Sequence, residues 1–258
     1  MSHYERSVEL YMSHPVHCVE SSATLVDAYE KLRAHRISCL AVVDARKPVG
    51  VLSRTDLLRV GRFESGRSPK SAVLSLPDER IREVMTRAIV TVRPDVALVK
   101  AARTMVDGNL HRVFVVDEGR LLGVLSTKEV MLAVSEARDA RPIRELMSSP
   151  VLTIRASEPV ALAVERLDRA HVSGVVVTEG DWPVGMFTQV ESLAARNAPR
   201  DTPVEDVMSP AMLCMSADTP IFRAAAQAAS TRARRVIATE GRTMKGILTG
   251  VDFTRAAT

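Results

Sequence analysis

Hydrophobic and polar residues follow one recurring pattern along the chain, seen clearly in residues 85–136. Residues 89–92 alternate as in a short β-strand, and residues 97–106 place apolar side chains on one stripe of a predicted helix. Residues 113–116 are all apolar, as expected of a strand buried on both faces. A glycine turn then leads to a strand over 121–125 and a last helix. The pattern therefore predicts the order strand, helix, two strands, helix.

Four segments of the chain repeat this pattern in register. Each has a methionine, an alanine 16 residues later, a glycine 38 residues after the methionine, and an acidic residue six after the glycine. The methionines and alanines are Met12, Met85, Met147, Met208 and Ala28, Ala101, Ala163, Ala224. The glycines and acids are Gly50, Gly123, Gly185, Gly246 and Asp56, Glu129, Glu191, Asp252. Marks shared at this spacing identify an internal repeat.

The repeat defines the expected domain organisation of an α/β (α+β) protein. The predicted copies are residues 8–62, 81–136, 142–198 and 203–257. A copy of about sixty residues with three short strands is marginal alone, so the copies are expected to pack in pairs, first with second and third with fourth. Residues 63–80 form an insertion rich in glycine, serine and proline. We interpret it as a solvated loop, with a mobile basic flap over a ligand as the alternative.

Composition excludes several classes of protein. The net charge is +4, from 35 basic and 31 acidic residues, and aromatic residues make up 3%, so a nucleic-acid interface is not favoured. The apolar runs are too short for a transmembrane helix. Three cysteines without a CxxC motif favour a reducing cytoplasm, and 29 arginines against 6 lysines favour a bacterial source with a GC-rich genome. The histidines lack metal-ligand spacing and no nucleophile motif occurs, so we expect neither an enzyme nor a bound metal or cofactor.

Each copy carries the motif Gly-h-h-[Ser/Thr]-x-x-[Asp/Glu], where h is apolar, at the end of its third predicted strand. The first copy has it at residues 50–56, after a middle strand His35-Arg36-Ile37-Ser38-Cys39-Leu40-Ala41-Val42-Val43-Asp44. Over residues 8–256 the chain resembles the CBS-domain family, although a proline common at the position of Ala41 is absent. Its layout is similar to the four-repeat γ subunit of AMP-activated protein kinase and to prokaryotic stand-alone CBS proteins. The resemblance implies two tandem pairs (Bateman modules) in a pseudo-symmetric disc, with adenosine derivatives such as AMP, ADP, ATP or S-adenosylmethionine bound between paired copies.

The hydroxyl and acid of the motif support two interpretations. A hydroxyl followed three residues later by an acid forms a capping box for the next helix. The resemblance adds a role in which the carboxylate accepts hydrogen bonds from ribose hydroxyls. Since glutamate is one methylene longer than aspartate, the sites predicted for ribose are Ser53 with Asp56 and Thr249 with Asp252. The sites expected to be weak, altered or empty are Ser126 with Glu129 and Thr188 with Glu191.

Basic pairs precede the middle strand in two of the copies. They are His111-Arg112 in the second copy and Arg234-Arg235 in the fourth, one in each half of the chain. Arginine matches phosphate oxygens with two parallel hydrogen bonds, so a phosphate contact is one interpretation, and charge protecting a strand edge is the other. By analogy with the family, the adenine slots are expected at Ala101, Leu110 and His111 for one site and at Ala163, Val172 and Ser173 for the other.

These observations favour a non-catalytic sensor of adenine nucleotides, including the energy state that they report. The repeats fill the sequence, so an unidentified effector protein is expected to read the ligand state in trans, or the chain to act through self-association as a homodimer. Two alternatives remain open: a nucleic-acid-binding module that uses the arginine-rich surface, and a ligand-free dimerisation scaffold.

Overall fold

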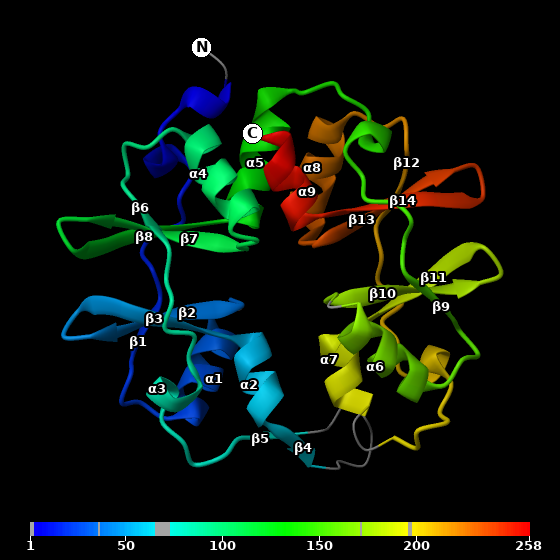
Figure 1. Cartoon of the computed structure of the whole chain (residues 1–258), viewed down its shortest axis with the longest axis horizontal. Coiled ribbons are helices and arrows are strands. Elements are labelled where there is room, and N and C mark those ends of the chain that lie inside the picture. Colours follow the sequence, from blue (N-terminus) through cyan, green and yellow to red (C-terminus); the bar gives the residue numbers. More distant parts are fainter. Residues whose placement is uncertain (1–2, 36, 65–72, 171, 196–197) are drawn as a thin grey trace. The chain divides into compact units, whose positions relative to one another are not determined.

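The computed structural model describes residues 3–35, 37–64, 73–170, 172–195 and 198–258 (Figure 1). Within these ranges each copy contains one three-stranded sheet and the two α-helices of the predicted pattern, which confirms the predicted α/β class and element order. The first two copies contain β1 (Cys18–Glu20), α1 (Leu25–Ala34), β2 (Cys39–Asp44), β3 (Lys47–Ser53), α2 (Arg54–Val60) and β6 (Thr91–Val92), α4 (Leu98–Asp107), β7 (Arg112–Asp117), β8 (Arg120–Ser126), α5 (Thr127–Ala137). The last two contain β9 (Thr153–Arg155), α6 (Val160–Arg169), β10 (Gly174–Glu179), β11 (Trp182–Thr188), α7 (Gln189–Ala194) and β12 (Cys214–Ser216), α8 (Ile221–Thr231), β13 (Arg235–Glu240), β14 (Thr243–Thr249), α9 (Gly250–Ala256).

All four sheets share one topology. The first strand pairs in parallel with the second, and the second pairs antiparallel with the third, so the apolar second strand is central. In the second copy Val113 and Val115 are fully buried, as the continuous apolar run predicts. Gly119 has a φ of +74° in the turn between β7 and β8, a conformation that favours glycine. Local sequence therefore accounts for the sheet of each copy.

The leading segment of each copy packs against the neighbouring copy in the sequence, not against its own. Ser13 exchanges backbone hydrogen bonds with Val124 of the second copy, and Thr86 of the second copy does so with Val51 of the first. The third and fourth copies make the same exchange, through the pairs Ser148 with Ile247 and Ser209 with Met186. Consecutive copies are thus interlocked through their first residues.

This exchange explains the constant spacing of the marker methionines and glycines. A methyl group added at Gly246 would lie 2.6 Å from Cγ of Met147 and 3.0 Å from the carbonyl oxygen of Ser148. Met12, Met85 and Met208 cover Gly123, Gly50 and Gly185 in the same way. Glycine is required at these positions because the methionine of the partner copy lies directly on the backbone. The marker methionine and the marker glycine are therefore the two sides of one contact between copies.

The chain divides into two compact units. Unit 1 contains residues 1–16, 90–151 and 212–258, and unit 2 contains residues 17–89 and 152–211. The bodies of the second and fourth copies lie in unit 1, and those of the first and third lie in unit 2.

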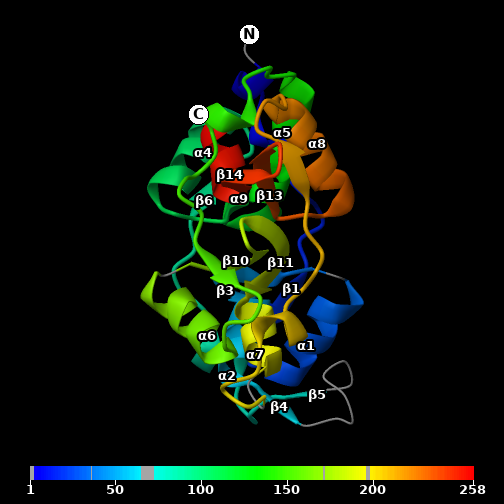
Figure 2. The same ribbon diagram turned by 90° about the vertical axis from the view of Figure 1, so that its right-hand side faces the viewer.

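In unit 1 the helices α4, α5, α8 and α9 share one hydrophobic core (Figure 2). Small side chains on α8 let it approach α5 closely, and Phe253 of α9 is fully buried in the same core. The alanines of α8 in this core are Ala224, Ala225 and Ala228. In unit 2 the bodies of the two copies have separate cores.

Two short strands flank the middle of the predicted insertion. Antiparallel strands β4 (Arg62–Glu64) and β5 (Val73–Ser75) pair there, with Arg62 opposite Ser75, and helix α3 (Ile81–Val84) follows. Residues 65–72, on which the flap alternative depends, lie outside the described residues. A search of the described helices finds none that is long and apolar enough to cross a bilayer.

Candidate anion-binding site

The two basic pairs are placed by the strand ladders of unit 1. Arg112 begins β7 and lies opposite Ser126, the residue before α5. Arg235 begins β13 and lies opposite Thr249, the residue before α9. Each pair therefore lies beside the start of the last helix of its copy.

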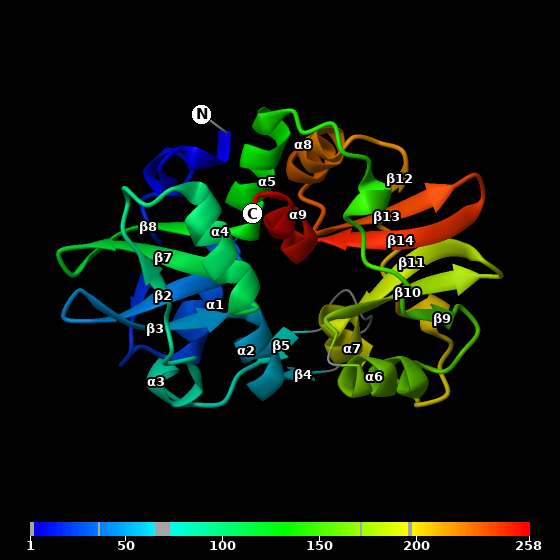
Figure 3. The same ribbon diagram turned by 45° about the horizontal axis from the view of Figure 1, so that its top comes forward.

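The starts of α5 and α9 are in direct contact (Figure 3). A methyl group added at Gly250 would lie 2.6 Å from Oγ1 of Thr127, so the first residues of the two helices touch and glycine is needed for the approach. The N–H of Thr127 donates to the carbonyl oxygen of His111 at 3.1 Å, which fixes the first basic pair against the start of α5. The contact between Thr127 and Gly250 joins the second copy to the fourth beside this basic pair.

The four basic residues are near enough to one another for their charges to interact. Partial burial lowers the pKa of His111 below its usual value, and the charges of Arg112, Arg234 and Arg235 lower it further. The sequence places one basic pair in each half of the chain, and the fold gathers both in unit 1. We call His111, Arg112, Arg234 and Arg235 the basic cluster.

The corresponding position of unit 2 carries neutral residues. Cys39 lies opposite Ser53, and Gly174 lies opposite Thr188, in the registers that Arg112 and Arg235 occupy in unit 1. The residue before each is a serine, Ser38 or Ser173. The two units therefore differ in charge at equivalent sites, and unit 1 is the one suited to an anion.

The basic cluster has the chemistry of a phosphate site. Guanidinium groups bind phosphate oxygens in pairs. The N-terminus of α5, a helix of 11 residues, adds backbone N–H groups and a partial positive charge. Among the described residues, no group of three or more histidine, cysteine, aspartate or glutamate side chains could hold a metal ion.

The motif hydroxyl and acid form capping bonds in every copy. One carboxylate oxygen accepts from the backbone N–H of the hydroxyl residue three positions earlier, at 2.8 Å for Asp56 and Ser53 and at 2.7 Å for Asp252 and Thr249. The Glu-led copies make the same bond, at 2.9 Å for Glu129 and Ser126 and at 3.0 Å for Glu191 and Thr188. Glutamate and aspartate thus cap equally well, and the extra methylene does not change this role.

The carboxylates differ in burial. The side chain of Asp252 is 2% exposed and that of Glu129 is 5% exposed, whereas that of Asp56 is 13% exposed. The second oxygen of Asp252 accepts from Ser148 at 3.0 Å, and that of Glu129 accepts from Ser13 at 2.8 Å. Both serines directly follow a marker methionine, and the motif, which lies in the other copy, does not point to them.

Replacement of Asp252 by alanine is expected to lower the free energy of unfolding by about 1–3 kcal/mol while the chain still folds. The change removes the helix cap and leaves the Ser148 hydroxyl without its acceptor. The matched control is Asp56→Ala, with an expected loss of about 1 kcal/mol or less, because that carboxylate is more exposed and its second oxygen accepts from exposed Arg59 at 3.4 Å. Urea unfolding measures both; equal losses would contradict a special structural role for Asp252.

The predicted adenine-slot residues lie inside helices α4 and α6 or in the loops that follow them. Ala101 and Ala163 are fully buried, which their contact with the core explains. Leu110 and Val172 are partly buried, and Ser173 is exposed, in the loops before β7 and β10. In each predicted cleft, the ribose residues and the adenine residues belong to different units. The ribose residues Ser53 and Asp56 lie in unit 2, whereas their predicted adenine partners Ala101 and Leu110 lie in unit 1. The ribose residues Thr249 and Asp252 lie in unit 1, whereas their predicted adenine partners Ala163, Val172 and Ser173 lie in unit 2.

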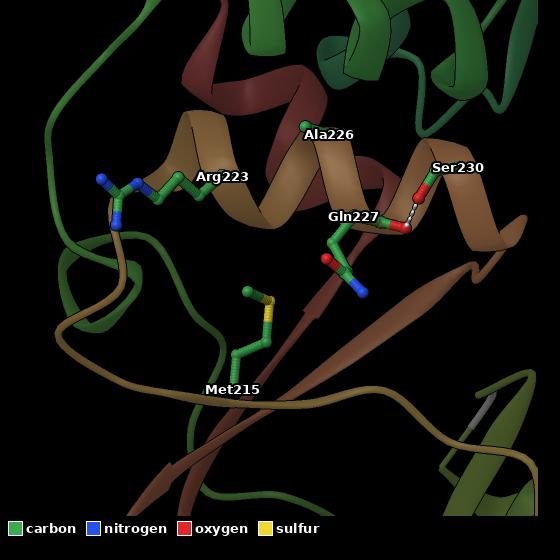
Figure 4. Close-up of a pocket in the computed structure, with 5 residues that line it drawn as sticks. All are labelled: Met215, Arg223, Ala226, Gln227 and Ser230. Atoms are coloured by element: carbon green, nitrogen blue, oxygen red, sulfur yellow. Dashed lines mark hydrogen bonds between the residues drawn. The ribbon is translucent and has the colours of Figure 1, made fainter.

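A shallow depression of unit 1 lies on the outer face of α8 (Figure 4). It is lined by Met215, Arg223, Ala226, Gln227 and Ser230, and none of these belongs to the basic cluster. The hydroxyl of Ser230 donates to the backbone oxygen of Gln227 at 2.9 Å, within the helix. The depression brings together no group of charges and is separate from the candidate site.

Comparison with known proteins defines the family. The CBS-domain model matches residues 7–62, 81–136 and 143–191, more than half of the chain, and the chain therefore belongs to the CBS-domain family. The crystal structure of a Methanocaldococcus jannaschii protein, proposed to be an archaeal homologue of γ-AMPK, has a TM-score of 0.78 and 16% identity, over 98% of this chain and 100% of that one. The two proteins share a fold.

Two longer proteins show similar sequences. An uncharacterized protein of Methanocaldococcus jannaschii is 24% identical over 197 residues, which cover 70% of this chain and 45% of that protein. CBS domain-containing protein CBSCBSPB2 of Arabidopsis thaliana is 25% identical over 262 residues, which cover 85% of this chain and 47% of that protein. The chain spans about half the length of these relatives.

Proposed function

We propose that this CBS-domain protein is a regulatory sensor that binds an adenosine-containing nucleotide (AMP, ADP, ATP or a similar ligand), with the phosphates at the basic cluster of unit 1. The observation that carries the proposal is the convergence of His111-Arg112 and Arg234-Arg235 beside the touching starts of α5 and α9. Membership of the CBS-domain family supports a regulatory role.

The ribose and adenine of the nucleotide are assigned to the motif residues and to the predicted adenine slots. In unit 1, ribose would be held by the hydroxyl and carboxylate of Thr249 with Asp252, since a carboxylate accepts from both ribose hydroxyls, and adenine would lie against Ala101 and Leu110. In unit 2, Ser53 with Asp56 would hold ribose, and Ala163, Val172 and Ser173 would line the adenine slot. Ser126 with Glu129 and Thr188 with Glu191 are proposed as weak or altered sites.

Regulation without catalysis agrees with the chemistry of the cysteines. Burial raises the pKa of the Cys18 thiol and of the Cys214 thiol, which disfavours the thiolate that a nucleophile needs. Cys18 begins β1 and Cys214 begins β12, positions held by threonine in the other two copies. The signal would pass to an effector protein or to a second copy of the chain.

The proposal is tested by titrating the unmodified protein with AMP, ADP, ATP and S-adenosylmethionine in thermal-shift and calorimetric experiments. Heat of binding and a rise in Tm with at least one of them are expected. A matched titration with single- and double-stranded oligonucleotides at two salt concentrations separates the nucleic-acid alternative, which predicts steeply salt-dependent binding that ATP does not displace. Absence of any response to millimolar ligand would leave the dimerisation scaffold as the function.

The histidine of the basic cluster predicts how affinity depends on pH. In the free protein its pKa lies below the usual 6.5. A bound phosphate stabilises the charged imidazolium and raises this pKa, so binding takes up a proton and the contribution of His111 to affinity grows as the pH falls below about 6.5.

Calorimetry of the unmodified protein and of His111→Gln between pH 5.5 and 8 measures this contribution. The titration of the ligand itself is common to both proteins, so the difference between their profiles belongs to His111. The two affinities are expected to converge at pH 8 and to separate as the pH falls. Parallel profiles would show that His111 does not face the phosphate.

A further inference from the structure

We propose that Ser148 sets the nucleotide affinity of unit 1, because its hydroxyl occupies the oxygen of Asp252 that a ribose needs and leaves it when ribose binds. The proposal deepens the proposed function and rests on it. Its basis is the hydrogen bond between Ser148 and Asp252, with an oxygen–oxygen distance of 3.0 Å.

The carboxylate of Asp252 is saturated with donors. A carboxylate offers about four lone-pair positions. One oxygen accepts from the backbone N–H and the hydroxyl of Thr249, both at 2.7 Å. The other accepts from the hydroxyl of Ser148 and from Arg255, both at 3.0 Å. A ribose hydroxyl can therefore bind this group only by displacing a donor.

The donors of Thr249 are the least replaceable of the four. They belong to the capping box that begins α9, and their removal would leave a helix N-terminus without its cap. The remaining donors come from the side chains of Ser148 and Arg255, which are both exposed residues. Asp252 itself is buried, so these two side chains lie between the carboxylate and the solvent.

The neutral donor is the one that an anionic ligand replaces. The guanidinium of Arg255 makes a charge-assisted hydrogen bond to Asp252, which is stronger than the neutral bond from the hydroxyl of Ser148 and costs more to break. The hydroxyl of Ser148 has no charge and is matched by the hydroxyl of a ribose, so the exchange costs the carboxylate no hydrogen bond. Because the two bonds have the same length, the difference in charge favours replacement of Ser148.

The displaced serine lies on a segment that connects the units. Residues 143–151 belong to unit 1, and the chain enters unit 2 directly after Val151. Ser148 is held there by its side chain and by backbone bonds to Ile247 at 2.9 and 3.0 Å. Loss of the side-chain bond loosens this connection. The second copy repeats the device, since Ser13 donates to Glu129 and the chain enters unit 2 after Val16.

The test compares Ser148→Ala with the unmodified protein by calorimetry with ATP. The variant is expected to bind about two- to tenfold more tightly, because the competing hydrogen bond is gone. Ser209→Ala is the matched control: Ser209 also follows a marker methionine, and its hydroxyl accepts a hydrogen bond from the backbone N–H of Ala211 at 3.4 Å. Its affinity is expected to equal that of the unmodified protein.

Hydrogen exchange of residues 145–151 provides a second readout. ATP is expected to increase exchange there in the unmodified protein, whereas Ser148→Ala is expected to exchange faster without ligand and to respond less. Tighter binding by Arg255→Ala and not by Ser148→Ala would identify the arginine as the displaced donor and overturn the proposal.

The outcomes separate this proposal from the proposed function. If the unmodified protein and Ser148→Ala bind ATP with equal affinity and equal exchange, the sensor function stands and the role of Ser148 is wrong. If Ser148→Ala binds nucleotide and the unmodified protein does not, the hydroxyl blocks the site and the proposal stands. If neither protein binds any nucleotide, both the function and the proposal are wrong.

Discussion

Replacing both Arg112 and Arg235 by alanine is expected to lower the affinity for ATP by about a hundredfold or more. Each half-buried arginine begins a strand beside the start of a helix, and both act on His111 electrostatically. A hydrogen bond to a charged group contributes about 1.5–3 kcal/mol, so two such losses correspond to about 3–6 kcal/mol. Calorimetry measures the change, and adenosine, which has no phosphate, is expected to bind both proteins equally.

Arg112→Ala alone and Arg120→Ala each remove one positive charge, so comparing them separates a local effect from the loss of net charge. Arg120 lies at the far end of the β7–β8 ladder, opposite Asp117. Arg120→Ala is therefore expected to leave ATP affinity within about twofold, since an exposed charge away from the site is screened by salt. ATP affinity that survives the double substitution would rule out the basic cluster as the phosphate site. An equal loss in the control would show that only overall charge matters.

The second large effect is expected from Gly246→Ala, which should lower the free energy of unfolding by about 1–3 kcal/mol. The added methyl group would lie 2.6 Å from Cγ of Met147 and 3.0 Å from the carbonyl oxygen of Ser148. Both atoms belong to the leading segment of the third copy, which must move away from the sheet of the fourth. Thermal and urea unfolding measure the loss.

A double substitution shows whether the contact with Met147 causes this loss. Met147→Ala alone removes side-chain packing, and Gly246→Ala alone creates the collision. If the methionine is the obstacle, the two changes together are expected to cost at least about 1 kcal/mol less than the sum of the single changes. Additive losses would assign the effect of the glycine to the backbone near Ser148 instead of to the methionine.

Local sequence predicted the elements well because each depends on neighbours in the chain. The strand at residues 113–116 and the helix at residues 97–106 correspond to β7 and α4. The hydroxyl and acid of the motif were interpreted as a capping box, and the structure confirms the capping bonds in all four copies. Spacings of two, three and four residues determine these features, so no distant contact is needed to predict them.

Local sequence does not predict how the motif acid is surrounded, whether it is glutamate or aspartate. Their different lengths led to an expectation that Glu129 and Asp252 would differ as ribose ligands. In the structure both are buried, both cap a helix, and both accept a hydrogen bond from a serine after a marker methionine. That serine comes from the other copy of the pair, more than a hundred residues away in sequence for either acid, and nothing local to the motif shows it.

Local sequence is enough to predict the four copies, their internal order of elements, the capping motif and membership of the CBS-domain family. Contacts between residues far apart in the chain decide which copy covers which glycine and where the charges meet. The basic pairs, separated by more than a hundred residues, gather in unit 1 because α5 and α9 begin in contact at Thr127 and Gly250. The repeat predicts the elements of each copy. Burial of a shared hydrophobic core packs the helices of the second and fourth copies together, and this packing brings their basic pairs close to each other.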